Sequence, residues 1–134
     1  MTTVLDGSVL VAALVDSGDE GKWAESILDA GPLAGPELLL VEATNILRRL
    51  ERSSSLSRLE ATSAHRDIRR LDVELFPFEP FAERVWALRH NLTAYDAWYV
   101  AVAEILGGQL ATLDRHLSRA AGPKCEVVTP PRVD

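Results

Sequence analysis

Four carboxylates far apart in the chain, Asp6, Glu42, Asp96 and Asp114, are the side chains best suited to carry chemistry. The chain offers only one cysteine and three well-separated histidines as competing metal ligands. Oxygen ligands alone favour Mg²⁺ or Mn²⁺ over zinc, which prefers nitrogen and sulfur. One such ion, or two ions about 3.5–4 Å apart, would activate a water and stabilise the leaving oxygen in phosphodiester hydrolysis. The acids therefore indicate a divalent-metal site, provided that the fold brings them together.

Three of the acids also have a simpler explanation as helix caps. Asp6 and Asp114 each precede a predicted helix, where an aspartate can accept hydrogen bonds from the free N–H groups of the first turn. Asp96 lies three residues after Thr93, which is the spacing of a capping box, and the helix dipole favours an acid there. Taken singly, each of these residues is explained at least as well by capping as by metal binding.

Glu42 is harder to explain as a structural residue, because it lies in the middle of a predicted helix. Its neighbours on the same helical face are Leu38, Leu39, Asn45 and Ile46. A carboxylate on a largely apolar face costs desolvation energy unless it is paired or binds a cation. Asn45 could orient it beside a metal. The alternative is a glutamate at the edge of that face that reaches water or Arg49.

The spacing of apolar residues predicts strands that alternate with helices along the chain. The strands are expected at residues 2–5, 32–34, 73–76, 109–112 and 126–129, and the helices at residues 8–15, 22–30, 36–52, 57–71, 80–90, 93–106 and 115–120. Pro36 is expected to open the long third helix, because its missing N–H costs nothing in a first turn. In the helix at 80–90, Trp86 is expected to turn inward with Phe81, Val85 and Leu88.

Alternating strands and helices imply an α/β domain with a parallel sheet that is covered on both faces. We expect one domain at residues 1–134, with an ordered core at 2–128 and a loose tail at 129–134. In open sheets of this kind, sites form outside the carboxyl ends of the strands. Asp6 follows the first predicted strand and Asp114 follows the fourth, so the two acids can converge at one edge of the sheet.

Composition excludes several other classes of protein. Apolar residues make up 47% of the chain, which argues against disorder. Apolar runs such as Val9–Val15 are too short to cross a bilayer. The first residues lack the basic and apolar regions of a signal peptide, so the expected compartment is the cytoplasm. The single Cys125 excludes an intramolecular disulfide framework.

The net charge of −6 at first argues against a nucleic-acid partner. Two divalent ions held by the four acids would, however, bring −6 to −2 by adding +4. Half of the fourteen Lys and Arg also lie within one segment, as Arg48, Arg49, Arg52, Arg58, Arg66, Arg69 and Arg70. This cluster is either a basic face or an ordinary solvated helix surface. Arg49, on the predicted Glu42 face, is the first candidate for a contact with a substrate phosphate.

Four blocks of sequence together resemble a known family. They are Val4–Ala12, Val41–Arg49, Leu92–Glu104 and Leu113–Leu117. In order and spacing they resemble the four blocks of PIN-domain nucleases over residues 2–128. Each block alone is unspecific, whereas the ordered set is a strong signal. The compact form most resembles the VapC toxins of bacterial and archaeal toxin–antitoxin pairs.

The resemblance implies a three-layer α/β/α sandwich with a mainly parallel sheet of four to five strands. It also implies an Mg²⁺- or Mn²⁺-dependent endoribonuclease whose metal-site acids are Asp6, Glu42, Asp96 and Asp114. Ser8, Asn45 and Thr112 fall where the family carries small polar residues beside that site. The implied partners are RNA, a second copy of the chain and a VapB-like antitoxin, with no membrane. The chain departs from the family at Gly7, where alanine is commoner, and at Trp98, which is bulkier than usual.

Two rival interpretations remain at the level of sequence. A phosphatase or phospho-acceptor domain with Asp6 as the reactive group would need a lysine nearby, and neither Lys22 nor Lys124 lies near a suitable strand end. A catalytically inactive PIN fold, kept as an RNA- or protein-binding module, would be expected to have lost one or more of the acids. All four are present.

Overall fold

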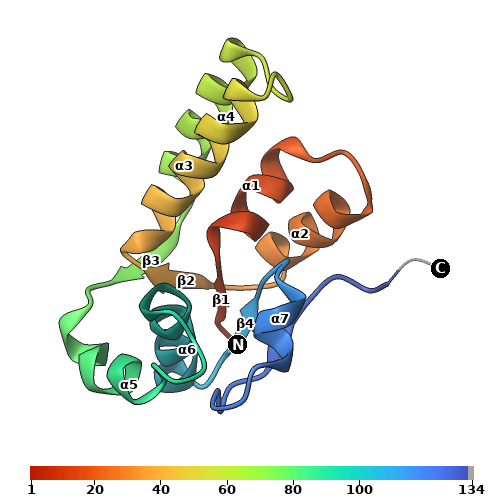
Figure 1. The fold of residues 1–134 in the computed structure, drawn as a ribbon. Helices are drawn as coiled ribbons and strands as arrows, with labels where there is room; N and C mark the ends of the chain where they lie inside the picture. Colours follow the sequence, from red (N-terminus) through yellow and green to blue (C-terminus); the bar gives the residue numbers. More distant parts are fainter. Residues whose placement is uncertain (133–134) are drawn as a thin grey trace.

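The computed structural model describes residues 1–132 and contains one central sheet with helices on both faces (Figure 1). The strands are β1 (Thr3–Leu5), β2 (Leu33–Pro36), β3 (Val73–Phe76), β4 (Gln109–Ala111) and β5 (Val127–Val128). The helices are α1 (Gly7–Val15), α2 (Asp19–Asp29), α3 (Leu38–Arg52), α4 (Arg58–Arg70), the 3₁₀ turn η1 (Glu79–Phe81), α5 (Ala82–Ala87), α6 (Ala94–Leu106) and α7 (Arg115–Arg119). The predicted α/β/α class is confirmed.

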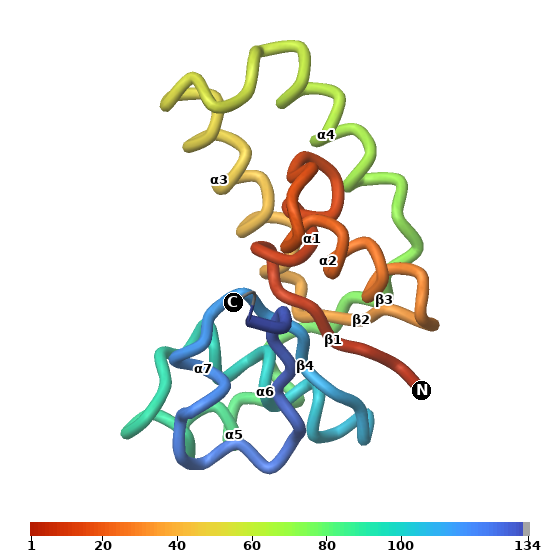
Figure 2. Tube along the Cα trace, turned by 90° about the vertical axis from the view of Figure 1, so that its right-hand side faces the viewer, coloured from red at the N-terminus to blue at the C-terminus, as the bar shows by residue number. Residues whose placement is uncertain are grey.

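The sheet has the strand order β3-β2-β1-β4-β5, and every neighbouring pair is parallel. The chain first moves outward from β1 to β3 and then returns to place β4 on the other side of β1. Because crossovers between parallel strands are right-handed, this reversal puts α1–α4 on one face and α5–α7 on the other. Figure 2 shows the two groups of helices on opposite sides of the strands. The reversal places the carboxyl ends of β1 and β4 side by side, where sheets of this kind commonly form a crevice for a ligand.

The core explains why the strands carry continuous apolar runs. All three residues of β1 are buried, as expected for a central parallel strand that is covered on both faces. The helix α6 packs against β1, β2 and β4, and its residues Tyr99–Ala103 are buried. These contacts fix the amino-terminal turn of α6 beside the crevice.

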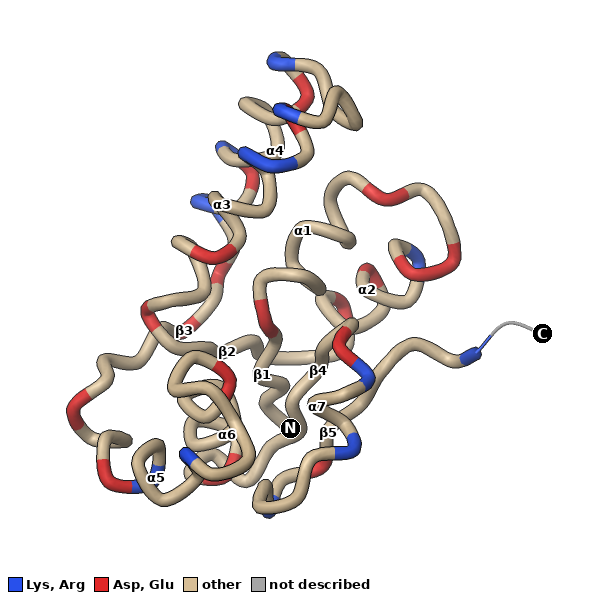
Figure 3. The backbone as a smooth tube through the Cα atoms, viewed as in Figure 1, with Lys and Arg blue, Asp and Glu red and all other residues tan. Residues whose placement is uncertain are grey.

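The antiparallel helices α3 and α4 form a hairpin that extends away from the sheet (Figure 1). Ser57 begins α4 with a complete capping box, in which Ser57 and Glu60 each accept a hydrogen bond from the other's backbone N–H. The arginine-rich segment lies on this hairpin, and Figure 3 shows Lys and Arg gathered along it. The segment predicted to be basic is therefore a well-formed helical arm.

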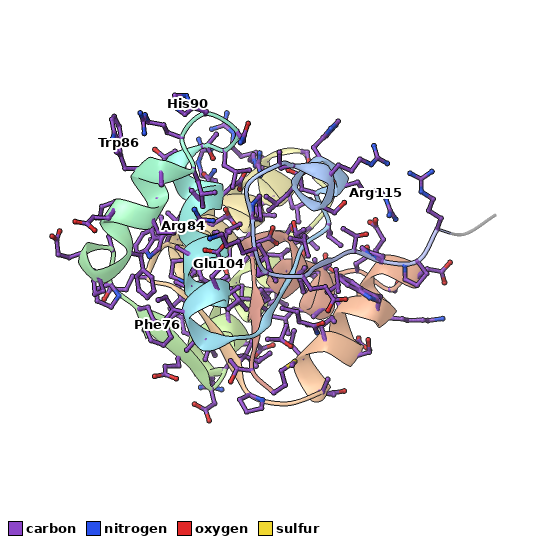
Figure 4. The ribbon with its side chains drawn as sticks, turned by 90° about the horizontal axis from the view of Figure 1, so that it is seen from below. Phe76, Arg84, Trp86, His90, Glu104 and Arg115 are labelled. Carbon is purple, nitrogen blue, oxygen red and sulfur yellow. The ribbon has the colours of Figure 1, made fainter. Side chains whose placement is uncertain are left out.

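Two predictions about local structure were wrong. Pro36 is the buried last residue of β2, paired with Phe76, and α3 begins only at Leu38. A proline is tolerated there because the strand ends at that point. The predicted helix at 80–90 is a 3₁₀ turn followed by the short α5, and Trp86 is 67% exposed rather than turned inward. Its ring carries the guanidinium of Arg89 at 4.3 Å, and Figure 4 shows it standing out from the body.

The carboxyl-terminal segment is held at its start. The Arg115 guanidinium donates to Thr129 Oγ1 at 3.2 Å and to the Pro130 carbonyl at 2.8 Å. Residues 133–134, the end of the tail expected to be loose, lie outside the described residues. Within residues 1–132, no helix is both long and apolar enough to span a membrane.

Candidate functional site

Asp6 stands at the carboxyl end of β1, where it caps α1. Its Oδ1 accepts hydrogen bonds from the backbone N–H groups of Ser8 (3.1 Å) and Val9 (3.3 Å) and from the Ser8 hydroxyl (2.5 Å). Its Oδ2 accepts one hydrogen bond, from the hydroxyl of the buried Thr112 at 2.5 Å. Oδ1 is therefore fully used by protein donors, whereas Oδ2 keeps a free lone pair in the crevice region between β1 and β4.

Glu42 projects from the second turn of α3 toward the amino terminus of α1. Its Oε1 accepts hydrogen bonds from the Gly7 backbone N–H at 2.5 Å and from the Tyr99 hydroxyl at 3.2 Å. The carboxylate is half-buried, and among the described residues it forms no ion pair with Arg49, the alternative partner considered from the sequence. Glu42 thus ties α3 to α1 and α6 through one oxygen.

Asp96 and Asp114 complete the group from the other side. Asp96 lies in the first turn of α6, after Thr93, whose hydroxyl caps the helix by accepting from the Asp96 N–H at 3.2 Å. Asp114 follows β4 and caps α7 through the His116 N–H at 2.9 Å. Asp6 therefore caps α1, and Asp114 caps α7. Capping leaves one oxygen of each carboxylate available, so capping and metal binding do not exclude one another.

The charges of the four acids act on one another. Burial raises the pKa of Asp6 above its usual value, against the opposing hydrogen bonds from Ser8, Thr112 and Val9. Burial and the charge of Asp6 raise the pKa of Glu42. Burial and the charges of Asp114 and Asp6 raise the pKa of Asp96. Asp6 and Asp96, which are separated by 90 positions in the sequence, are thus electrostatic neighbours in the fold.

This donor set fits a hard divalent cation in its chemistry and charge. It contains only oxygen ligands, and a cation would relieve the mutual repulsion of the carboxylates. Within residues 1–132, however, no three His, Cys, Asp or Glu side chains are already gathered closely enough to hold an ion. The chemistry of these residues therefore fits a divalent ion, although the carboxylates would have to move closer together to hold it.

The small polar residues predicted beside the acids differ in their placement. The Ser8 hydroxyl contacts Asp6 and accepts a hydrogen bond from the Leu113 N–H at 3.3 Å. The Thr112 hydroxyl also accepts from the Asp114 N–H at 3.0 Å, so it links two of the acids. Asn45 is exposed, and the described residues give it no hydrogen bond to Glu42.

Sequence reasoning missed two residues of this site. Tyr99 was not singled out, although its position three residues after Asp96 places both side chains on one face of α6. Gly7 was noted only as a departure from alanine. Its role depends on the approach of α3 to α1, and the local sequence contains no signal for that approach.

A groove of about 410 Å³ runs beside the acids. It lies between α1 and α3, and its lining includes Ser8, Ile46 and Leu113. A larger hollow of about 680 Å³ lies between α2 and the carboxyl-terminal segment, but none of the four acids lines it. None of the four acids lines the smaller groove either, but Ser8 and Leu113 on its wall are close neighbours of Asp6 and Asp114 in the chain.

Comparison with known proteins agrees with this geometry. The PIN domain matches residues 3–123 of the chain. VapC ribonuclease Mb0985 of Mycobacterium bovis is 37% identical over 129 residues, which cover 96% of this chain and 98% of that protein. The crystal structure of PAE2754 from Pyrobaculum aerophilum has a TM-score of 0.71 and 26% identity, covering 95% of this chain and 83% of that one.

A third similar structure is a protein–DNA complex. The structure of VapBC2 from Rickettsia felis bound to a DNA fragment from their promoter contains a chain with a TM-score of 0.66 and 16% identity, covering 98% of this chain and 100% of that one. At that identity the similarity concerns the fold alone. The match to residues 3–123 means that the chain belongs to the PIN-domain family. The chain is 37% identical to the Mycobacterium protein over almost the full length of both proteins. This similarity places it in the VapC branch of that family.

Proposed function

We propose that this chain is an Mg²⁺- or Mn²⁺-dependent endoribonuclease and the toxin of a toxin–antitoxin pair. The observation that carries the proposal is the convergence of four acids from separate elements at the crevice between β1 and β4. Burial raises the pKa values of Asp6, Glu42 and Asp96, and the charges of neighbouring acids raise those of Glu42 and Asp96 further. Protein interiors tolerate such a cluster when a cation offsets its charge. The name of the 37%-identical Mycobacterium relative supports RNA as the substrate class.

Each acid has a separate part in holding the ion. Asp6 through Oδ2, Asp96 and Asp114 would bind it directly, and Glu42 would bind directly or through a water. When bound, the ion supplies an activated water and neutralises charge at the phosphate. The Thr112 hydroxyl orients Asp6 by donating to Oδ2 and positions the Asp114 backbone by accepting from its N–H. Metal chemistry of this kind does not require the 2′-OH, so the preference for RNA must come from groove shape and contacts.

Arg49 is the proposed first contact with a substrate phosphate. It lies seven residues after Glu42 on α3, which is about 10 Å along the helix and close to the same face. Its side chain is exposed, and the ion pair among the described residues, Arg84–Glu104, does not involve it. A guanidinium in that position can bind a phosphate near the acids.

The proposed protein partners are a VapB-like antitoxin that covers the acids and a second copy of the chain. The structure of the Rickettsia complex, similar in fold, supports the first. The second rests on the resemblance to VapC toxins, and exposed apolar side chains that a second copy could cover lie on α3, α5 and α6, namely Val41, Trp86, Tyr95 and Ile105.

A cleavage assay on purified toxin, freed of antitoxin, tests the activity. We expect RNA cleavage in Mg²⁺ or Mn²⁺ that EDTA stops and added metal restores. Asp96→Asn should lower the rate at least about 100-fold without changing the far-UV circular dichroism. Asp72→Asn, an exposed aspartate before β3, is the matched control and should cleave normally. The products should carry 5′-phosphate and 3′-hydroxyl ends. Cleavage that survives EDTA, or full activity of Asp96→Asn, would refute the assignment.

A further inference from the structure

The Glu42 carboxylate is held from two sides by residues of other helices. The Gly7 N–H, at the amino terminus of α1, donates to Oε1 at 2.5 Å, and the Tyr99 hydroxyl, from α6, donates to the same oxygen at 3.2 Å. No donor among the described residues contacts Oε2. One oxygen is thus committed to the protein and the other is left for a ligand.

Gly7 makes this arrangement possible through its missing side chain. A Cβ at position 7 would lie 2.6 Å from Glu42 Oε1, 2.8 Å from Glu42 Cγ and 3.0 Å from the Ala43 backbone nitrogen. Gly7 is not among the residues with a positive φ, so backbone conformation does not require glycine there. The Glu42 carboxylate occupies the space that the methyl group of an alanine at position 7 would need. An alanine there would therefore have to displace the carboxylate.

Tyr99 supplies the second donor from within the core. Its side chain is 1% exposed, and Glu42 is the hydrogen-bond partner of its hydroxyl. A buried hydroxyl without a partner is costly, so the pair stabilises both residues. Burial and the charge of Glu42 raise the pKa of Tyr99 well above its usual value, which keeps the hydroxyl protonated as a donor.

We propose that Gly7 and Tyr99 are positioning residues that fix Glu42 with Oε1 turned to the protein and Oε2 turned to the metal. This inference rests on the proposed function, because it assumes an ion among the acids. Both residues act only through Glu42. Their loss should therefore weaken ion binding without removing a ligand.

Mn²⁺ binding, measured as loss of the free-ion signal in electron paramagnetic resonance, tests this role without RNA. Tyr99→Phe should weaken Mn²⁺ binding about tenfold, as expected when a hydrogen bond to a metal ligand is removed. Tyr95→Phe is the matched control, because Tyr95 is a 65% exposed tyrosine of the same helix, and it should bind like wild type. In a Glu42→Ala background, Tyr99→Phe should have no further effect.

A second variant tests the close approach at Gly7. Gly7→Ala should weaken Mn²⁺ binding, and Glu42→Asp, whose shorter side chain withdraws from the new methyl group, should partly restore it in the double variant. Equal Mn²⁺ binding by Tyr99→Phe and wild type would overturn the positioning role alone. Failure of wild type to bind Mn²⁺ would overturn the proposed metal site as well.

A different observation carries a second inference, about the outer face of α4. Residues 48–70 contain seven arginines and three acids, so this segment has a net charge of +4. The whole chain has a net charge of −6, so the rest of the chain has a net charge of −10. All seven arginines are exposed. Arg66 and Arg70 lie on the side of α4 opposite its buried residues Ala61, Ala64 and Ile68, and Arg58 and Arg69 lie beside them. The acids Glu60 and Asp67 instead line the hollow that faces α1.

We infer that this arginine face of α4 (Arg58, Arg66, Arg69 and Arg70) binds the phosphate backbone of RNA outside the acid site. The face is about 18 Å long, at 1.5 Å per residue, which spans several phosphates of a strand. Among the described residues, the ion pair is formed by Arg84 and Glu104, and it involves none of these arginines. They are therefore available to a polyanion. This inference also rests on RNA being the substrate.

RNA binding in EDTA, followed by fluorescence anisotropy at several salt concentrations, tests the arginine face without cleavage. Arg66→Gln/Arg69→Gln/Arg70→Gln should lower the slope of log affinity against log salt by about 2, since each contact to single-stranded RNA contributes about 0.7. Lys22→Gln/Arg119→Gln/Arg132→Gln changes the net charge equally at exposed positions elsewhere and should have much less effect. Equal effects of the two triple variants would overturn the inference. The inference would also be overturned if Arg66→Gln/Arg69→Gln/Arg70→Gln lost binding to poly-L-glutamate as strongly as binding to RNA. The face would then be assigned to an acidic polypeptide.

Discussion

At the scale of single residues, Asp6 shows how one side chain can serve structure and chemistry together. Its Oδ1 caps α1, and its Oδ2 is held only by Thr112. The sequence placed Asp6, Ser8 and Thr112 near one another because strand ends converge in a parallel sheet. It did not place Tyr99 against Glu42, because that contact depends on how α6 packs across the sheet.

Thr112 offers a prediction at this scale. Thr112→Val keeps the shape of the buried side chain but removes the hydroxyl that donates to Asp6 and accepts from the Asp114 N–H. We expect the free energy of unfolding to fall by about 1–3 kcal/mol, because two polar groups lose their partner. Urea denaturation measures this change. Thr62→Val, on the exposed surface of α4, should have little effect, and equal stabilities of Thr112→Val and wild type would contradict the proposed link.

At the scale of elements, periodicity predicted most helices and strands but failed where tertiary contacts overrode local preference. Pro36 suits the first turn of a helix, yet pairing with β3 keeps it in β2. Trp86 fits an inward helical face, yet α5 is only six residues long and the ring lies against Arg89 outside the core. Neither outcome follows from the local sequence, because both depend on where the neighbouring element ends.

The junction of α5 and α6 gives a prediction about pH. Arg84 donates to both oxygens of Glu104, at 2.7 and 3.0 Å, and to the Gly122 carbonyl at 3.0 Å; Figure 4 shows the two side chains together. Burial alone would raise the pKa of Glu104, but the hydrogen bonds from Arg84 and from the Lys124 N–H outweigh it and lower that pKa. The stabilisation is therefore present above the usual glutamate range and is lost as the pH falls through the lowered pKa.

Glu104→Gln should thus destabilise the protein at neutral pH by about 1–2 kcal/mol, and much less in acid. Urea denaturation at about pH 7 and about pH 3 measures the difference. Glu83→Gln on α5, outside this ion pair, is the control. A difference between wild type and Glu104→Gln that stays constant across this range would show that the ion pair does not stabilise the junction.

At the scale of the whole molecule, the reversal of strand order determines where the chemistry can lie. A site at the carboxyl ends of the strands was predictable from alternating strands and helices, and the family blocks marked the four acids. Periodicity does not predict the strand order, because strand pairing depends on tertiary contacts, yet this order brings Asp6 and Asp114 to the same edge. The division of charge was already visible in the clustered arginines of the sequence, and the fold places them on a hairpin that extends from the acidic body.

The four acids, although they come from separate elements, should form one divalent-metal site. Crystals soaked in Mn²⁺ can show this site itself, because manganese gives an anomalous diffraction signal. We predict a peak in the crevice between β1 and β4, about 2.0–2.3 Å from carboxylate oxygens of Asp6, Asp96 and Asp114, and its loss in Asp96→Asn. A fully occupied manganese elsewhere, or a crevice that stays empty at millimolar Mn²⁺, would contradict the proposed site.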